Sequence, residues 1–368
     1  MVACGVLRAQ WEIQDSGTSA DLRGISVDGG VAWASGSNGT VLRTEDGGYL
    51  WQACAVPPGA EHLDFRGIQA FDADTAIVMS SGKGDLSRLY ETTDGCQTWK
   101  LILRNSDKGR SWDALYFDRH QWGWLLGNPV KGRLILYYSD DRGRTWLELR
   151  NKGLEAQAKD QGGFAVGNSS ISGTSGAIEF GIGGNNGAFV YSITKTGICV
   201  EDCDTEDISQ AEQHTEWAHQ EVPIGNHSAS SGVFSLAARP GQTSSIWGAA
   251  AIVAVGGDSL KPDDQKSTAA FTIDGGKTWQ VAETPPHGFR SAVAYDAATK
   301  TWITVGPNGT DISTDDGRNW HALHPDPALH EPPDADRDWN ALSLPFVVGP
   351  DGRIGKLNPK ALNAAQRP

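Results

Sequence analysis

Three arginines stand at the same position of a repeated apolar strand and are the residues best placed to bind a ligand. Arg23, Arg66 and Arg290 each follow the first residue of such a strand. A guanidinium group binds a carboxylate through two parallel hydrogen bonds. In a chain with a formal net charge of -14, three arginines in one place would concentrate anions there. We therefore predict that they recognise an acidic partner, either a protein segment or a carboxylated carbohydrate.

Other polar residues occupy equivalent positions. Asp113 and Asn340 stand at the arginine position of two further strands. If the loop that follows the second strand of each repeat lies beside these strand starts, its polar groups reach the same surface. The loop residues concerned are Asn128, Asn185, Asp258, Lys261 and Asn308. The predicted ligand-binding site comprises this set together with the three arginines.

Two alternatives compete with this interpretation. In the first, the arginines only form salt bridges with Asp21, Asp64 or Asp338 of neighbouring repeats. In the second, the protein is a carbohydrate-active enzyme with Asp113 and Asp258 as its catalytic carboxyl groups. A retaining glycosidase needs two such groups roughly 5 Å apart. Spacing along the chain does not give that distance, so the alternative stays open.

A recurring motif reveals the elements that must position these residues. The pattern Ser/Thr-x-Asp-x-Gly-x-x-Trp occurs at 44–51, 92–99, 139–146, 272–279 and 313–320, with Cys96 in place of glycine in the second copy. A short carboxylate accepts hydrogen bonds from the following backbone N–H groups, and glycine adopts positive φ at little cost. The tryptophan can start the next strand and pack between sheets. Each motif therefore predicts a turn, in which the aspartate is structural.

The strands before each motif repeat as well. Inner strands open at residues 22, 65, 112, 233, 289 and 339, and a further repeat at 162–222 lacks the aspartate and carries an acidic insertion around 201–216. The last repeat has no motif, whereas Trp11–Gln14 has the form of a strand that follows one. With 45 glycines and 14 tryptophans, the chain is predicted to be an all-β, seven-bladed β-propeller closed by its N-terminal strand. The predicted boundaries are a leader at 1–10, the propeller at 11–358 and a C-terminal tail at 359–368.

The motif resembles the Asp box of sialidases and other BNR-repeat propellers, where it forms the turn between the third and fourth strands of a blade. Longer runs are similar to the photosystem II stability/assembly factor-like family of propellers. These runs are Gly256–Asp258 with Lys261–Pro262, Gly288–Val293, Gly306–Gly309 and Gly349–Ile354. The similarity covers nearly all of residues 11–358.

This second resemblance implies a function. Photosynthetic members act as lumenal or periplasmic assembly chaperones that bind a reaction-centre subunit precursor through an arginine patch, which Arg23, Arg66 and Arg290 would supply here. We therefore expect a non-catalytic, assembly-factor-like binding propeller, although the acidic insertion departs from the family and leaves the partner open. The sialidase resemblance implies the alternative, a glycoside hydrolase or lyase. Phe65–Ile68 matches the F/Y-R-I-P signature of sialidases only in part.

The composition and the cysteines limit the classes of partner and the cellular compartments that fit this protein. The acidic net charge argues against nucleic acid as partner, and no run reaches the roughly 18 to 20 apolar residues that span a bilayer. Cys4 follows a small residue, as in bacterial lipoprotein signals, so it is either a lipid anchor or an ordinary cysteine. Cys199 and Cys203 could close a small disulfide loop, whereas one CxxxC is weak for zinc. We expect an exported, periplasmic or extracellular monomer without metal or cofactor.

Overall fold

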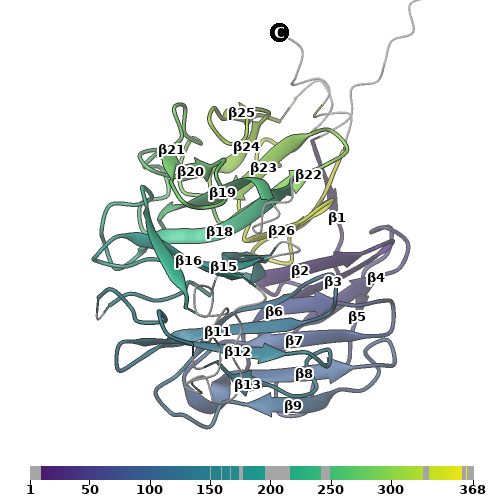
Figure 1. Cartoon of the computed structure of the whole chain (residues 1–368). Coiled ribbons are helices and arrows are strands. Elements are labelled where there is room, and N and C mark those ends of the chain that lie inside the picture. The colour runs from purple at the N-terminus through teal and green to yellow at the C-terminus, as the bar shows by residue number, and fades with distance from the viewer. Residues whose placement is uncertain are drawn as a thin grey trace, which may run out of the picture.

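The computed structural model describes residues 10–149, 151–158, 160–165, 167–173, 177–194, 216–241, 249–325, 331–358 and 362. These residues form seven four-stranded antiparallel sheets. The first strand of each sheet contacts the first strand of the next sheet, so that the seven blades close a ring (Figure 1). The predicted seven-bladed β-propeller is therefore confirmed. Within the described residues, no helix is long and apolar enough to cross a bilayer.

The blades follow one another in chain order, and the innermost strand of each is named first here. Blade 1 is β2 (Leu22–Asp28), β3 (Val31–Gly36), β4 (Val41–Thr44) and β5 (Gln52–Ala53), and blade 2 is β6 (Phe65–Ala70), β7 (Ala76–Ser80), β8 (Arg88–Thr92) and β9 (Lys100–Arg104). Blade 3 is β10 (Trp112–Phe117), β11 (Gly123–Val130), β12 (Arg133–Ser139) and β13 (Leu147–Glu148), and blade 4 is β14 (Ile171–Gly173), β15 (Ala177–Ile182), β16 (Ala188–Thr194) and β17 (Ala218–Val222). Blade 5 is β18 (Ser231–Pro240), β19 (Ala249–Asp258), β20 (Ala269–Thr272) and β21 (Gln280–Val281), and blade 6 is β22 (Ala292–Asp296), β23 (Thr301–Gly306), β24 (Gly309–Ser313) and β25 (His321–Leu323). Blade 7 is β26 (Ala341–Ser343), β27 (Phe346–Val348), β28 (Ile354–Leu357) and β1 (Trp11–Gln14), and two 3-10 helices, η1 (Gly84–Leu86) and η2 (Asn168–Ser170), lie in connecting segments.

The N-terminal strand closes the ring. Strand β1 pairs antiparallel with β28, from Trp11 opposite Leu357 to Gln14 opposite Ile354, and in Figure 1 the purple β1 lies beside the yellow C-terminal strands. Trp11 is only 1% exposed, and its Nε1 donates to Thr310 Oγ1 of blade 6 (3.1 Å). The predicted closure is confirmed, and it covers an edge that would otherwise present unpaired backbone groups.

All five Asp boxes form the same turn. In blade 6, Asp315 Oδ1 accepts hydrogen bonds from the Ser313 hydroxyl (2.8 Å) and the Asn319 N–H (2.9 Å). The Gly317 N–H donates to Ser313 Oγ (3.1 Å). The other four boxes repeat these bonds at equivalent positions. The box aspartates are thus occupied by their own turns, as predicted for a structural motif.

The second Asp box has a cysteine, Cys96, where the other four boxes have glycine, and the structure shows what this cysteine does. Cys96 adopts φ 64° there, in the left-handed region that glycine normally fills. Its sulfur forms a disulfide with Cys54, which follows the outer strand of blade 1 and is 42 residues away in sequence. The bond joins blades 1 and 2, a pairing that the sequence left undecided. Cys4, Cys199, Cys203 and the acidic insertion at 201–215 lie outside the described residues.

The apolar cores lie between adjacent blades. The box tryptophans of blades 1, 2 and 6 (Trp51, Trp99 and Trp320) are buried in these cores. Trp146 and Trp279 are only partly buried, because each packs at the edge of its cluster. The expectation that every box tryptophan is an interior residue therefore holds for three of the five.

One glutamate is buried in the wall of the ring. Its neighbours Ile178 and Phe180 pack in the core between blades 3 and 4, so Glu179 projects from the opposite face of β15. Gly181 on that face lies against Val233 of blade 5. Glu179 is 2% exposed, and neither carboxyl oxygen has a hydrogen-bond partner among the described residues. Burial raises its pKa to about 8.

Candidate functional site

Four bulged residues stand near the start of their inner strands, at the end of the ring opposite the Asp boxes: Arg23, Arg66, Asp113 and Phe234. We call this end of the ring the channel mouth. The pairing between the first and second strands slips by one residue at Arg23 in blade 1, at Arg66 in blade 2 and at Asp113 in blade 3. Phe234 occupies the same position in blade 5. A bulged residue leaves the ladder, and its side chain is redirected. These residues were predicted to occupy equivalent positions in their blades. They do so because the same bulge recurs in each of these blades, on the face opposite the Asp boxes.

Arg23 and Arg66 are joined through one carboxylate. Nε of Arg23 lies 3.0 Å from Asp64 Oδ1, and Nε of Arg66 lies 2.7 Å from Asp64 Oδ2. Arg23 also pairs with Asp21 (3.2 Å). The two arginine side chains remain 26% and 29% exposed. The salt-bridge alternative thus describes both residues, and both side chains still remain partly exposed.

Arg290 behaves differently. Its side chain is 0% exposed and forms an ion pair with Asp311 of β24, which is also buried. Nη1 donates to Asn308 Oδ1 (2.6 Å), and His287 Nδ1 lies 2.7 Å from Asp311 Oδ1. Arg290 therefore does not face a ligand as the sequence analysis predicted, because an interior ion pair uses its guanidinium. The expected cluster of three arginines is reduced to the pair in blades 1 and 2.

The predicted amide and lysine side chains serve mainly as connectors or stand apart from the mouth. Asn340 Nδ2 donates to the Leu22 carbonyl (2.8 Å) and so links blade 7 to blade 1. Asn128 donates to Ser111 Oγ (2.6 Å), while Asn185 is an exposed loop residue. Lys261 is 60% exposed. Among the predicted amides, Asn308 contacts an arginine, the buried Arg290, and Asn340 is bonded to the residue that precedes Arg23.

The two candidate carboxyl groups have different surroundings. Asp258 accepts hydrogen bonds from Asn226 (3.0 Å), Ser228 (3.1 Å) and Ser230 (2.5 Å). Although burial opposes it, this set of donors lowers the pKa of Asp258 to about 2. Asp258 therefore organises its own turn. Asp113 is also buried, but its Oδ2 has no hydrogen-bond partner among the described residues.

Burial raises the pKa of Asp113 well above its ordinary value, and the nearby Arg66 guanidinium opposes this shift only in part. A carboxyl group without donors in an enclosed site is costly when ionised. Asp113 is therefore the candidate residue whose environment most needs an additional partner.

A segment that the sequence analysis did not anticipate lies across the mouth. We call residues 160–165 and 167–170 the plug. It lies between the outer strand of blade 3 and the inner strand of blade 4, pairs with blade 4 where Gly162 lies opposite Gly183 just after β15, and reaches Arg66, whose Nη1 donates to the Ala165 carbonyl (2.5 Å). Gly167 then lies against Ala341 of blade 7, and η2 returns the chain to blade 4. The signal in the sequence was the long, glycine-containing connection between 149 and 171.

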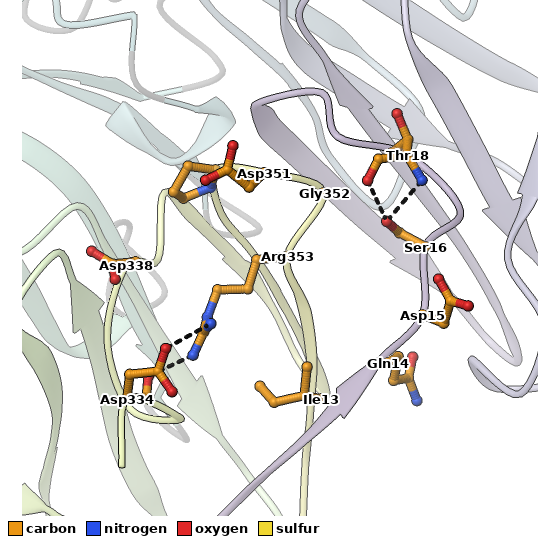
Figure 2. A pocket seen from close by; sticks show the side chains of 11 residues that line it. Ile13, Gln14, Asp15, Ser16, Thr18, Asp334, Asp338, Asp351, Gly352 and Arg353 are labelled. Carbon is orange, nitrogen blue, oxygen red and sulfur yellow. Dashed lines mark hydrogen bonds and ion pairs between the residues drawn. The ribbon is translucent and has the colours of Figure 1, made fainter. Parts of the chain in front are cut away.

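A second feature of the same face lies at the closure seam. A cleft of about 390 Å³ is lined by the end of β1, the loop before β28 and the connection to blade 7. Four aspartates line it, and Figure 2 shows Arg353 turned towards Asp334 (3.3 Å between Nη1 and Oδ2). The remaining acidic lining residues are Asp15, Asp338 and Asp351. The cleft is therefore acidic, in contrast to the arginine pair.

The side chains at the channel mouth are of the kinds that bind ligands through hydrogen bonds, ion pairs and aromatic contacts. It combines two partly exposed arginine side chains, one buried carboxyl group and the aromatic ring of Phe234. Guanidinium groups bind carboxylates and carbonyls, and aromatic rings bind flat or apolar groups. This set suits the binding of an extended chain with polar groups at intervals.

Comparison with known proteins identifies the fold. No protein-family model matches the chain, and no curated protein matches its sequence. The structure is similar to YCF48 bound to a D1 peptide, with 16% identity, a TM-score of 0.57 and coverage of 95% of this chain and 96% of that one. It is also similar to YCF48 from Cyanidioschyzon merolae, with 17% identity, a TM-score of 0.57 and coverage of 96% and 100%. An ancestral GH74 enzyme has 10% identity and a TM-score of 0.52, over 91% of this chain and 40% of the enzyme. The chain therefore shares the seven-bladed fold of YCF48, a photosystem II assembly factor, and the resemblance indicated by its sequence is confirmed at the level of the fold.

Proposed function

We propose that this protein is a non-catalytic, assembly-factor-like propeller that binds a segment of a partner protein at the channel mouth. The observation that carries the proposal is the contact between Arg66 and the Ala165 carbonyl. Here the mouth already holds a stretch of main chain through an arginine. A similar fold is known with a bound peptide, YCF48 with its D1 peptide. Recognition of a peptide is therefore the activity that best fits this surface.

The two arginines indicate which charge the bound segment should carry. Arg23 pairs with Asp21 and Asp64, Arg66 pairs with Asp64, and both side chains remain partly exposed, so each can bind one further anionic group. We propose that the segment carries an acidic side chain or a terminal carboxylate at this point. Because the charges are near the surface, salt should weaken binding.

The surroundings of the carboxyl groups favour binding over glycoside hydrolysis. The Asp258 carboxylate already accepts hydrogen bonds from Asn226, Ser228 and Ser230, so it is engaged within its own turn rather than free to act on a substrate. Asp113 alone does not provide the carboxyl pair that the glycosidase mechanism needs. The enzymatic alternative is tested by incubating the protein with sialosides and uronic-acid oligosaccharides. Turnover that disappears in Asp113→Asn would favour the enzyme.

We propose an oxidising compartment for the protein. The Cys54–Cys96 disulfide supports this location, because disulfides persist in the periplasm and outside the cell but are rare in the cytosol. Mass spectrometry of protein from its native source, with and without reduction, tests the location. Reduced cysteines at 54 and 96 would contradict it.

Peptide selection tests the proposed function directly. Linear peptides selected from a display library on the immobilised protein should bind in a manner that weakens with salt. The double variant Arg23→Ala/Arg66→Ala should lose about ten-fold in affinity, which corresponds to about 1.4 kcal/mol. Arg318→Ala is the matched control, because Arg318 is an exposed arginine on the Asp-box face that pairs with Glu283.

The control variant should bind like the parent, and both variants should remain folded because the removed side chains are partly exposed. If the double variant binds the selected peptides as tightly as the parent, the channel mouth is not the binding site.

A further inference from the structure

The plug contacts the mouth through three different kinds of group. Its main chain supplies the Ala165 carbonyl to Arg66. Its only aromatic ring, Phe164, stacks on Phe234, with ring centroids 4.0 Å apart and an interplanar angle of 13°. Gly163 lies over Asp113. The plug thus occupies an arginine, an aromatic surface and a carboxyl group in consecutive residues.

Two glycines form the surface against which the Phe164 ring packs. Gly183 and Gly232 of blades 4 and 5 form a direct bridge beneath Phe164. A Cβ at Gly183 would lie 2.8 Å from the Phe164 ring and 2.5 Å from Cα of Gly232. Only glycines allow the two strands and the ring to approach so closely. The result is a flat surface that receives an aromatic ring.

The contact with Asp113 is incomplete. Gly163 has no side chain, and Oδ2 of Asp113 remains buried without a donor among the described residues. A Cβ placed on Gly163 would lie 3.0 Å from that oxygen. The plug therefore covers the carboxyl group without satisfying it, although a buried acceptor normally has a partner. This deficiency makes the closed arrangement less stable than one in which a donor reaches Asp113.

The part of the plug from Gly162 to Ala165 is partly exposed, which makes its departure feasible, whereas Gln161, Gly167 and Ser170 are buried and Asn168 Nδ2 donates to the Ile68 carbonyl. Gly162 to Ala165 are all of intermediate burial, whereas the inner strands below them are largely buried. Within this run, the backbone bonds to the ring are those between Gly162 and Gly183. Segments with few backbone bonds and partial exposure are the ones that open without global unfolding.

We propose that the plug is an internal ligand of the channel mouth, which a partner segment displaces by presenting an aromatic side chain to Phe234, a carbonyl or carboxylate to Arg66 and a cationic or amide donor to Asp113. The inference rests on the proposed function and names the class of segment that fits it. Partner binding supplies the donor that Asp113 lacks, so the exchange of one segment for another is favourable.

The first test measures opening without any ligand. In a background with Cys4, Cys199 and Cys203 replaced by serine, Asp113→Cys places one free thiol beneath the plug. Its labelling by a disulfide reagent should proceed at a rate independent of low urea concentrations, since local opening exposes little surface. Phe164→Ala should speed labelling about ten-fold. Labelling that rises with urea in parallel with global unfolding would overturn the proposal.

A reversible lock provides the control. A Cβ on Gly167 would lie 3.4 Å from the Ala341 Cβ, close to the range of about 3.5–4.5 Å found in disulfides. Gly167 has an extended backbone with φ 174° that any residue adopts. In a background that also carries Cys54→Ala/Cys96→Gly, so that only the new pair responds to reductant, Gly167→Cys/Ala341→Cys should therefore lock the plug when oxidised and release it when reduced. Oxidation should stop labelling at position 113, and undiminished labelling would show that the plug does not guard Asp113.

The second test uses linear peptides selected on the reduced lock variant, with Asp113 left in place. We expect the selected sequences to contain an aromatic residue beside a basic or amide residue, and to bind at least about ten-fold more weakly after oxidation. Equal binding in both states would refute displacement while leaving the proposed function intact. Failure to select any salt-sensitive binder would refute the proposed function, and the labelling experiment would still decide whether the plug opens.

Discussion

Replacing Glu179 with glutamine should change how the stability of the ring depends on pH. In the unfolded chain this carboxyl group loses its proton near the ordinary pKa of 4.5, whereas in the folded ring burial raises the pKa to about 8. Between these values the folded state binds more protons than the unfolded state. The free energy of unfolding must therefore fall as the pH rises through this window.

The size of the effect follows from the shift. Each unit of pKa difference is worth about 1.4 kcal/mol, so Glu179 should cost the native state about 3 kcal/mol at pH 7 and about 5 kcal/mol above pH 8, relative to acid pH. Glutamine carries no charge and removes this dependence. It leaves a buried amide, which adds a cost that does not vary with pH.

The assay compares urea unfolding of the parent and Glu179→Gln at a series of pH values from 4.5 to 8.5. The difference between the two proteins isolates position 179, because the other titrating groups are common to both. Glu221→Gln, at an exposed position of the same blade, is the control and should show no such trend. A difference that stays constant over the series would show that Glu179 is ionised and stabilised in the ring.

Three further predictions concern the closure of the ring, one buried ion pair and the disulfide. Deleting residues 1–16 should lower the thermal midpoint markedly in thermal unfolding. Trp11→Ala alone should cost about 3 to 5 kcal/mol, the usual range for a large core aromatic. Arg290→Ala should destabilise the fold by about 3 to 5 kcal/mol in denaturant titrations, because the buried Asp311 loses its arginine partner and keeps only His287 among the described side chains, and a loss below 1 kcal/mol would refute this pairing. Reducing the Cys54–Cys96 disulfide should cost about 2 to 4 kcal/mol, and Cys96→Gly should be more stable than Cys96→Ala in the same Cys54→Ala background, since glycine adopts the positive φ of this turn without strain.

The sequence by itself determined the architecture. Each Asp box is a local turn whose aspartate, hydroxyl and glycine lie within a few residues of one another, so its chemistry is visible in the sequence. The missing strand of the last repeat and the unassigned Trp11–Gln14 then left one way to close the ring. The common position of Arg23, Arg66 and Asp113 was also visible, because it follows from the repeat.

Only the tertiary structure decided which of these residues is available to a partner. Arg290 and Arg66 look equivalent in the sequence, yet Asp311 buries the first, and the second holds a carbonyl 99 residues away. Burial, ion pairing and the path of the plug depend on contacts between residues that are distant in the chain. Such contacts are set by how the blades pack, and no local pattern encodes them.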